Sequence, residues 1–322
     1  MDKIKQYRQL INQEIERLKS GNNNNEIYEP IQYMLSMGGK RFRPLMVLLG
    51  YAMFKPDVEK ILRPALAVEL FHNFTLMHDD IMDKAPLRRG KATVHEKWNS
   101  NVAILSGDVM FVKVCQLLQE VNPEMLPKVL ELFNRCAIEV CEGQQLDMDF
   151  ETRDEVSENE YLEMIRLKTA ALIGFSLNLG ALLAGTSSDN CKLLKEFGEK
   201  VGVGFQLKDD ILDVYGDQKK FGKRIGGDII ANKKTFLLIK AHEYLEHKSQ
   251  LDKYLTSDLF TDDERVREVT RLYDEIGVKE IADDNMNAAF QEAFKNLNEV
   301  KIDPQNKELL IAYTNNLISR DH

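Results

Sequence analysis

"LMHDDIMD" (76–83) places three carboxylates, those of Asp79, Asp80 and Asp83, within five positions of an otherwise apolar stretch. On an α-helix, residues four positions apart lie on one face about 5–6 Å apart, so Asp79 and Asp83 point the same way. Like charges at this spacing destabilise an isolated helix by roughly 0.2–0.5 kcal/mol. Carboxylates at the C-terminal end of a helix also oppose the helix dipole. The stretch therefore requires either a solvated helix end or a positive group bound to it.

The same pattern recurs in the second half of the chain, where LKDDILD (207–213) contains Asp209, Asp210 and Asp213. Both stretches end an apolar helical segment, and two matched motifs favour a bound cation over two solvated helix ends. No cysteine or second histidine stands at zinc spacing beside either motif, and carboxylates alone favour a hard ion, Mg²⁺ or Mn²⁺. For the same reason we interpret His78 as a packing or hydrogen-bonding residue rather than a ligand.

The composition indicates a folded cytoplasmic protein. Of its 322 residues, 43% are hydrophobic and 30% are charged, which suits a sizeable core and a solvated surface. The 52 acidic residues outnumber the 43 basic ones and give a net charge of −9, so nucleic acid is a poor candidate partner. The four cysteines form no C-x-x-C pair and indicate reduced thiols. The N-terminal stretch is amphipathic and charged, so we expect neither a signal peptide nor a membrane anchor.

Apolar residues recur at helical spacing along most of the chain, for example at Ile11, Ile15 and Leu18, and strand-type alternation is almost absent. The longest apolar run, residues 170–185, is shorter than the ~20 residues of a bilayer helix and predicts a buried core helix. No linker or change in composition divides the sequence, so we expect one domain over residues 1–322.

Four basic clusters flank the two acidic motifs. Each cluster alone is more typical of surface charge than of a ligand site, but together, in an acidic protein, they indicate binding of phosphate groups. The clusters are GGKRFRP (38–44), PLRRG (86–90), RLKTA (166–170) and FGKRIGGDIIANKKTF (221–236).

These motifs and their order resemble those of the trans-isoprenyl diphosphate synthases of the polyprenyl synthetase family. The match runs from GGKRFRP near residue 40 to NKKTF near residue 235. The resemblance implies an all-α fold, a single-domain bundle of long antiparallel helices around a central cavity (the type I isoprenoid synthase fold). It also implies a prenyltransferase that joins isopentenyl diphosphate head-to-tail to dimethylallyl, geranyl or farnesyl diphosphate.

The resemblance also assigns roles to the residues that match family motifs. About three Mg²⁺ ions per active site, replaceable by Mn²⁺, would be held by Asp79, Asp80, Asp83, Asp209, Asp210 and Asp213. The allylic diphosphate would be bound by Arg88, Lys168, Lys223 and Lys233. Isopentenyl diphosphate would be bound by Lys40, Arg43, His72 and Arg89. Thr169 and Gln206 would lie beside the reacting carbon. The residues expected to take part in catalysis are Asp79, Asp83, Lys168, Thr169, Gln206 and Asp209.

The chemistry is consistent with these roles. The leaving group is a diphosphate, and cations stabilise the negative charge that grows as the C–O bond breaks. The hydroxyl of Thr169 and the amide of Gln206 offer dipoles to the allylic cation, and water must be excluded from it. A lone histidine in an apolar helix, such as His72, is usually a core residue. His72 lies about two turns before Asp79 on nearly the same face, and the resemblance favours a substrate site.

Residues just before the first motif are expected to line the path of the growing chain. An ideal helix places Phe71 and Thr75 nearer to the Asp79 face than Phe74, so the inward direction of Phe74 follows from the resemblance alone. A bulky Phe74 and a first motif without a longer insert resemble short-chain synthases that make geranylgeranyl or farnesyl diphosphate. The alternative is that Phe71 and Phe74 are ordinary core residues.

Other functions fit part of the pattern. A longer-chain polyprenyl diphosphate synthase is the alternative for the product. A class I terpene cyclase shares the fold, but it needs no isopentenyl site such as GGKRFRP (38–44). A non-catalytic synthase subunit typically lacks a metal motif, whereas this chain has both. The resemblance further implies a homodimer, for which an apolar face near residues 101–140 is the candidate interface.

Overall fold

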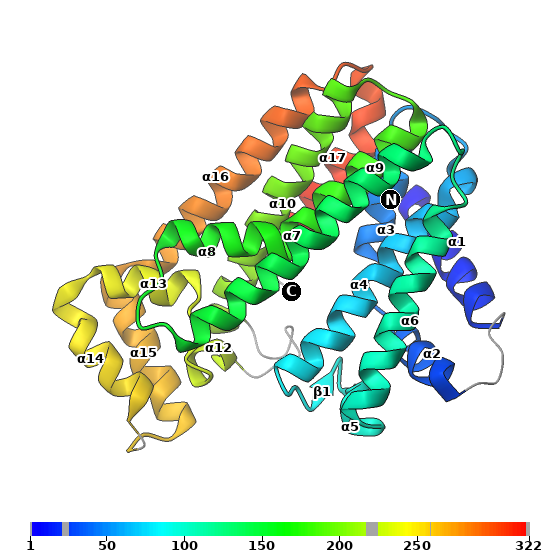
Figure 1. The fold of residues 1–322 in the computed structure, drawn as a ribbon. Helices are drawn as coiled ribbons and strands as arrows, with labels where there is room; N and C mark the ends of the chain where they lie inside the picture. The colour runs from blue at the N-terminus through cyan, green and yellow to red at the C-terminus, as the bar shows by residue number, and fades with distance from the viewer. Residues whose placement is uncertain (1, 21–25, 217–224, 258, 320–322) are drawn as a thin grey trace. The chain divides into compact units, whose positions relative to one another are not determined.

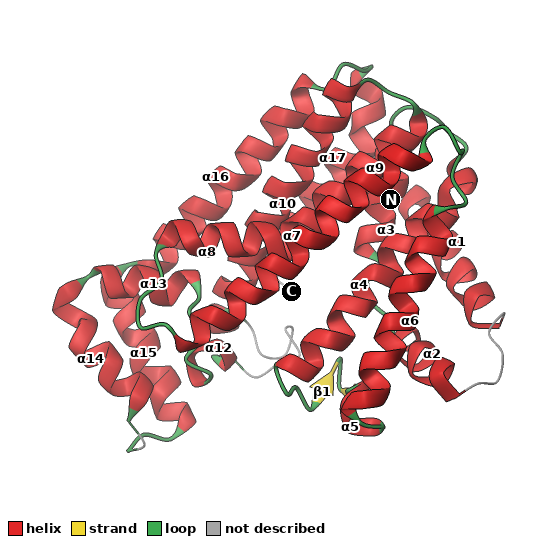
Figure 2. Cartoon of the chain, in the orientation of Figure 1, coloured by secondary structure: helices red, strands yellow, loops and turns green. Residues whose placement is uncertain are grey.

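The computed structural model describes residues 2–20, 26–216, 225–257 and 259–319. Almost all the regular structure in this part of the chain is helical, which confirms the predicted all-α fold (Figures 1 and 2). Its only described strands are β1 (Leu87–Arg88) and β2 (Lys91–Ala92), which pair antiparallel.

The fold comprises two compact units. The first unit contains Met1–Cys136, Phe175–Lys195 and Val300–Tyr313. The second unit contains Ala137–Gly174, Glu196–Glu299 and Thr314–His322. The single domain expected over residues 1–322 stays a prediction.

The helices follow one another with short connections. The N-terminal helices are α1 (Asp2–Ser20), α2 (Glu29–Ser36), α3 (Phe42–Ala52), α4 (Leu62–Met82), α5 (Val94–Lys97) and α6 (Ser100–Leu118), with 3₁₀ turns at Glu26–Tyr28 and Val58–Ile61. The central helices are α7 (Leu126–Thr152), α8 (Glu158–Ile165), α9 (Ala171–Ala184) and α10 (Ser188–Tyr215). The C-terminal helices are α12 (Gly227–Ile230), α13 (Phe236–Glu243), α14 (Leu245–Thr256), α15 (Asp262–Ile276), α16 (Val278–Glu299) and α17 (Pro304–Ile318).

Helix α4 lies in the core of the first unit and ends in the first acidic motif. Residues 65–71 are all buried, and a helix that is buried on every side reads as apolar all round. Helix α6 packs alongside α4 (Figure 1). The N-terminus of α6 is capped by Asn99, whose side chain accepts a hydrogen bond from the Val102 N–H at 2.9 Å. The first acidic motif is therefore held at the end of a firmly packed helix.

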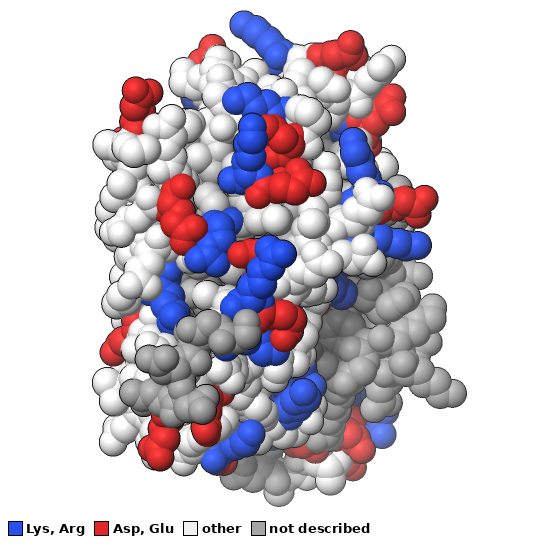
Figure 3. All heavy atoms as spheres, turned by 90° about the vertical axis from the view of Figure 1, so that its right-hand side faces the viewer, with Lys and Arg blue, Asp and Glu red and all other residues white. Residues whose placement is uncertain are grey.

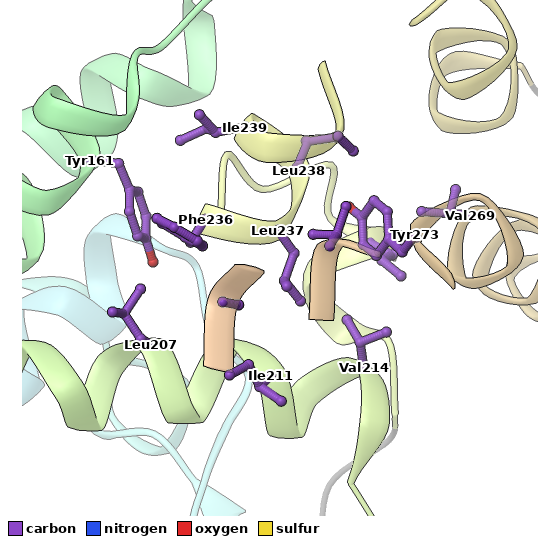
Figure 4. Packing of buried hydrophobic residues seen from close by; sticks show 14 of the residues in the cluster. Tyr161, Leu207, Ile211, Val214, Phe236, Leu237, Leu238, Ile239, Val269 and Tyr273 are labelled. Atoms are coloured by element: carbon purple, nitrogen blue, oxygen red, sulfur yellow. The ribbon is translucent and has the colours of Figure 1, made fainter. Parts of the chain in front are cut away.

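A hydrophobic cluster forms the core of the second unit. Side chains from α8, α10, α13 and α15 converge there, including Tyr161, Leu207, Phe236 and Val269 (Figure 4). Burial of such side chains contributes roughly 1.5–3 kcal/mol each. This packing fixes α10, which carries the second acidic motif.

Two helical stretches, Ser100–Leu118 and Glu158–Ala184, are long and apolar enough to cross a membrane, judged by length and composition alone. In Glu158–Ala184, 78% of the most apolar window is buried, and this burial confirms the core helix predicted for residues 170–185. In Ser100–Leu118, only 39% of the window is buried. One side of α6 thus leaves apolar side chains at the surface.

Charges are mixed over the surface. On the face drawn in Figure 3, basic and acidic side chains are interspersed in small groups. The described side chains on that face form no continuous basic band of the kind that follows a nucleic-acid backbone.

A π-helical turn, Arg166–Ala170, connects α8 to α9. The Ala171 N–H donates to the Arg166 carbonyl, an i→i+5 bond that adds one residue to the turn. Single π turns are frequent at functional sites. Gly143 of α7 faces this turn, and a Cβ at position 143 would lie 2.2 Å from the backbone nitrogen of Lys168. A glycine is therefore needed for α7 to approach the π turn.

We predict that Gly143→Ala lowers the free energy of unfolding by about 1–3 kcal/mol, because the new methyl group meets backbone that moves only at a cost. Urea unfolding followed by circular dichroism measures the change. Glu142→Ala is the matched control, since Glu142 is exposed on the same helix and its truncation should change stability by at most ~0.5 kcal/mol. Equal unfolding midpoints for the two variants would contradict the close approach.

Candidate active site

The aspartates of the first acidic motif lie on two different faces at the end of α4. Asp79 is half-buried and Asp83 is exposed one turn later, where its N–H donates to the Asp79 carbonyl at 2.8 Å. Asp80 is turned inward and is only 1% exposed. The guanidinium of Arg88 contacts both Asp80 oxygens at 2.7–2.9 Å. Asp80 therefore anchors Arg88, while Asp79 and Asp83 occupy the other face.

A tight hairpin holds the arginine pair. Arg89 and Gly90 connect β1 to β2 with φ of 53° and 75°, the left-handed pair typical of a two-residue hairpin turn. The hydroxyl of Tyr33 donates to the Ala92 carbonyl at 2.8 Å and ties the hairpin to α2. The hairpin thus fixes Arg88 and Arg89 just after the first motif, and sequence periodicity did not predict these short strands.

A cavity of about 430 Å³ lies in the first unit beside this hairpin. All four residues predicted to bind isopentenyl diphosphate line it: Lys40, Arg43, His72 and Arg89. The remaining lining residues are Gly39, Arg41, Phe42 and Glu69. The structure therefore brings together residues that the sequence spreads over fifty positions, from 40 to 89.

The electrostatics of this cavity favour an anion. Arg41 and Glu69 form a buried ion pair at 2.7 Å, which offsets one positive charge. Burial lowers the pKa of Arg43 to about 10, which still leaves it charged at pH 7. Burial, then the cation of Arg43, holds the pKa of His72 well below its usual range. The neutral ring accepts a hydrogen bond from Arg43 at 3.0 Å through Nε2.

Aromatic rings surround the residues predicted to limit chain length. Phe71 is fully buried and packs against Phe133 with ring centroids 5.2 Å apart. Phe74 is half-buried and lies 5.4 Å from the ring of Phe111 on α6. Phe111 also contacts Phe71 and Phe133, at 6.3 and 6.1 Å. The four rings form an aromatic cluster one to two turns before the aspartates of α4.

Two neighbours of this cluster, Thr75 and His78, form contacts with other groups of the protein. The hydroxyl of Thr75 donates to the His72 carbonyl of its own helix at 2.9 Å. His78 packs edge-on against Phe74, and its Nε2 lies 3.3 Å from the Ile104 carbonyl. His78 thus has the packing and hydrogen-bonding contacts that its sequence context predicts.

In the second unit, two of the predicted lysines share one carboxylate. Asp147 on α7 lies 2.5 Å from the Lys168 ammonium and 3.8 Å from that of Lys233. Burial alone would raise the pKa of Asp147, but Lys233 and Lys168 outweigh burial and hold it below its usual range. Asp147 is therefore ionised at neutral pH and positions both ammonium groups.

The second unit also brings together Thr169 and Gln206, the two residues expected beside the reacting carbon. The Thr169 hydroxyl donates to Gln206 Oε1 at 3.2 Å, and Gln206 Nε2 donates to Asp210 Oδ1 at 3.1 Å. Asp210 is 3% exposed and also accepts a hydrogen bond from the Tyr161 hydroxyl. Burial raises the pKa of Asp210 to about 7, although the hydrogen bonds from Tyr161 and Gln206 lower it.

The other aspartates of the second motif differ in exposure. Asp209 is exposed on α10. Asp213 accepts a hydrogen bond from the Asp228 N–H through Oδ2 at 3.0 Å, and its carbonyl accepts one from the Gly226 N–H at 2.6 Å. Asp213 therefore holds the start of α12. Lys223, which was also predicted to bind substrate, lies outside the described residues.

The donor set suits a hard divalent cation. Asp79, Asp83 and Asp209 offer carboxylate oxygens, the ligands that Mg²⁺ prefers. In the described part of the chain, however, no three carboxylate, imidazole or thiol groups converge on one point. A Mg²⁺ ion at either motif would complete its octahedron with phosphate oxygens and water, as this ion commonly does.

Sequence reasoning missed three residues of these clusters. Asp147, Tyr161 and Phe111 reach their partners through tertiary contacts that no local spacing encodes. One signal could have pointed to Asp147. It follows Gly143 by four positions, so it lies on the face of α7 that the glycine marks as closely packed.

Comparisons with known proteins agree with this geometry. The sequence signature of the polyprenyl synthetase family matches residues 24–276. A geranylgeranyl pyrophosphate synthase of Geoglobus acetivorans is 37% identical over 321 residues, which cover 99% of this chain and 98% of the relative. A crystal structure of a geranylgeranyl pyrophosphate synthase superimposes with a TM-score of 0.95 and 40% identity over 99% of both chains.

A relative that is named for a longer product is also similar. A geranylfarnesyl diphosphate synthase of Aeropyrum pernix is 33% identical over 296 residues, which cover 89% of this chain and 92% of the relative. The family signature spans well over half of the sequence, and the relatives match nearly its full length. The chain therefore belongs to the polyprenyl synthetase family.

Proposed function

We propose that this chain is a geranylgeranyl diphosphate synthase, a trans-prenyltransferase that joins isopentenyl diphosphate to an allylic diphosphate. The observation that carries this proposal is the cavity where Lys40, Arg43, Arg89 and a neutral His72 meet. Such a cavity suits a second diphosphate substrate. A terpene cyclase ionises one allylic diphosphate and needs no such site, and similarity to geranylgeranyl diphosphate synthases over the whole chain supports the same choice.

The allylic diphosphate is bound by Arg88, Lys168 and Lys233, with Lys223 as a fourth cation from the sequence pattern. Two carboxylates support this role. Asp80 fixes Arg88 by a two-pronged ion pair, and Asp147 holds the two lysines. Charge-assisted bonds from fixed cations to phosphate are stronger than neutral hydrogen bonds.

Enzymes of this family use Mg²⁺, and we assign its ligands by exposure. Asp79, Asp83 and Asp209 bind about three ions together with the substrate phosphates. Asp80 and Asp210 support them from within, since both are buried and each holds a neighbouring side chain, and Asp213 supports them by holding the start of α12. When bound, Mg²⁺ supplies positive charge to the leaving diphosphate.

The protein's own groups serve each step. The C–O bond of the allylic diphosphate breaks, and its electron pair leaves with the diphosphate, whose new charge Lys168 and Lys233 stabilise. Thr169 and Gln206 present oxygen atoms to the allylic cation. The double bond of isopentenyl diphosphate attacks the cationic carbon, and the released diphosphate takes the proton that is lost. Water must be excluded during this step, because it would otherwise capture the cation.

Chain length is set by the aromatic cluster of Phe71, Phe74, Phe111 and Phe133. Phe74 and Phe111 are its half-buried members, 5.4 Å apart, and of the two Phe74 lies on α4, one turn before the aspartates. Fully buried Phe71 serves the core, and Thr75 is bound to its own helix. Phe74 is therefore the residue that stops the growing chain at geranylgeranyl diphosphate.

The enzyme acts as a cytoplasmic homodimer. The apolar face of α6 with Ile104, Leu105 and Val112, which are 42–57% exposed, supports pairing with a second copy. Burial of such side chains against a partner stabilises a dimer by roughly 25 cal/mol per Å² of apolar area.

Mixed surface charge over the face in Figure 3 agrees with small diphosphates, rather than nucleic acid, as ligands.

Asp79→Ala is expected to lower kcat by about 10²–10³-fold or more, because the leaving group loses part of its charge stabilisation. The assay follows labelled isopentenyl diphosphate with each allylic primer, with Mg²⁺, with EDTA, and with Mg²⁺ restored. Glu142→Ala, at an exposed position of α7 outside the proposed interface, is the control and should retain wild-type rates. A wild-type rate in Asp79→Ala with unchanged circular dichroism would refute the metal assignment.

Phe74→Ala is expected to lengthen the main product by at least one isoprene unit, because it opens space beside Phe111. Chromatography of the dephosphorylated products measures the shift. Thr75→Ala is the neighbouring control and should leave product length unchanged. An unchanged product from Phe74→Ala would place the end of the path elsewhere.

Val112→Asp is expected to shift the protein from dimer to monomer, since a buried unpaired carboxylate costs several kcal/mol. Sedimentation equilibrium of wild-type protein and variant measures the change. Leu259→Asp makes the same chemical change at a residue that is 86% exposed outside α6, and it should leave the dimer intact. A dimer that persists in Val112→Asp would move the interface off this face.

A further inference from the structure

Tyr161 has no role in the proposed reaction, yet its hydroxyl forms a hydrogen bond with the second acidic motif. The ring is 2% exposed on α8, and Figure 4 shows its oxygen directed toward α10 on the side of Leu207. There the hydroxyl donates to Oδ2 of Asp210. A hydroxyl in such an apolar cluster needs a partner, because burying it without one costs roughly 1–3 kcal/mol.

Asp210 in turn holds Gln206. Its Oδ1 accepts from Gln206 Nε2 at 3.1 Å, while Oδ2 also accepts from the Phe236 N–H at 3.4 Å. On the other side of the amide, Oε1 accepts from the Thr169 hydroxyl at 3.2 Å. One continuous chain of hydrogen bonds thus runs from Tyr161 through Asp210 and Gln206 to Thr169.

The chemistry of the chain fixes its direction. Both oxygens of Asp210 accept hydrogen bonds here, Oδ2 from the Tyr161 hydroxyl and Oδ1 from Gln206 Nε2, so the NH₂ end of the Gln206 amide faces Asp210. The carbonyl end must then face Thr169. If the amide turned over, the positive NH₂ end would face the side where the proposed allylic cation forms, and a developing positive charge would be destabilised.

We infer that Tyr161 is a positioning residue, which acts through Asp210 to hold the Gln206 carbonyl toward the reacting carbon. This inference rests on the proposed function and extends it to two residues that bind neither substrate. Asp210 lies one position from Asp209, about 100° around α10, and its burial separates this task from metal binding.

The test is Tyr161→Phe, which keeps the ring and removes only the hydroxyl. Oδ2 of Asp210 then retains the longer bond from the Phe236 N–H, and the Gln206 amide loses its single orientation. We expect kcat to fall about 5- to 50-fold, less than for loss of a group that touches the transition state, with KM of both substrates within about twofold. The fraction of allylic substrate released as alcohol, the product of water capture, should rise.

Tyr273→Phe is the matched control. Tyr273 belongs to the same hydrophobic cluster and is equally buried, but it lies on α15. Its loss of a hydroxyl should leave kcat and the alcohol fraction at wild-type values. Thermal unfolding of both variants shows whether a general loss of stability explains any difference.

A double-mutant cycle separates positioning from a structural role. If Tyr161 acts through Gln206, then Tyr161→Phe has no further effect on kcat in a Gln206→Leu background. Additive effects in the cycle, or wild-type kcat and alcohol fraction in Tyr161→Phe, would overturn the inference.

A measurement that does not depend on turnover tests the inference separately from the proposed function. Hydrogen exchange of the Gln206 side-chain NH₂, followed by NMR, should be faster in Tyr161→Phe than in wild type and Tyr273→Phe. Unchanged exchange would overturn the inference even in an active enzyme. Absence of isopentenyl-dependent turnover in the wild type would overturn the proposed function instead.

Discussion

A carboxylate that is removed from water must be paired with donors, because an isolated buried charge costs many kcal/mol. This constraint applies to the middle aspartate of each acidic motif. Asp80 and Asp210 are 1% and 3% exposed, and each accepts hydrogen bonds on both oxygens. Since i and i+1 diverge by about 100° on a helix, turning the middle residue inward leaves the first and last aspartates on another face. Each acidic motif thus combines an anchoring carboxylate with two carboxylates on another side of the helix.

In the cavity of the first unit, the groups that must be held together are positively charged. Three arginines and a lysine line it, and Glu69 neutralises only Arg41 within it. Burial lowers the pKa of Arg43, and the pKa of His72 falls so far that its ring is neutral. Burial is the main cause of both shifts, and the neighbouring arginines add to that of His72. A diphosphate entering this cavity would supply negative charge and form bonds that the free protein lacks.

The sequence was informative where chemistry follows from local spacing, and uninformative where it follows from packing. Helical periodicity predicted the helices, and the family resemblance carried by the acidic motifs and the order of the basic clusters implied the all-α fold and the residues that line the cavity. The two-residue strands, the π turn and the partners Asp147 and Tyr161 depend on tertiary contacts, which no periodic pattern records. The ideal helical wheel favoured Phe71 and Thr75 as path residues, but Phe71 is fully buried and the Thr75 hydroxyl is bound to its own helix, so of the two phenylalanine rings on α4 only Phe74 is half-buried.

The two motifs are alike in sequence, yet their anchored residues differ in kind. In the first unit the buried carboxylate holds a guanidinium, so it orders a charge. In the second unit it holds an amide, so it orders a dipole. A diphosphate leaving group needs fixed charges, whereas a carbocation beside it needs a dipole of known direction that does not capture it. The same Asp-Asp-x-x-Asp pattern can serve both needs because its middle residue takes whichever partner the surrounding helices present. In the second unit Tyr161, a residue of the hydrophobic core, donates to the same carboxylate, so the packing of the core and the orientation of the amide are linked there.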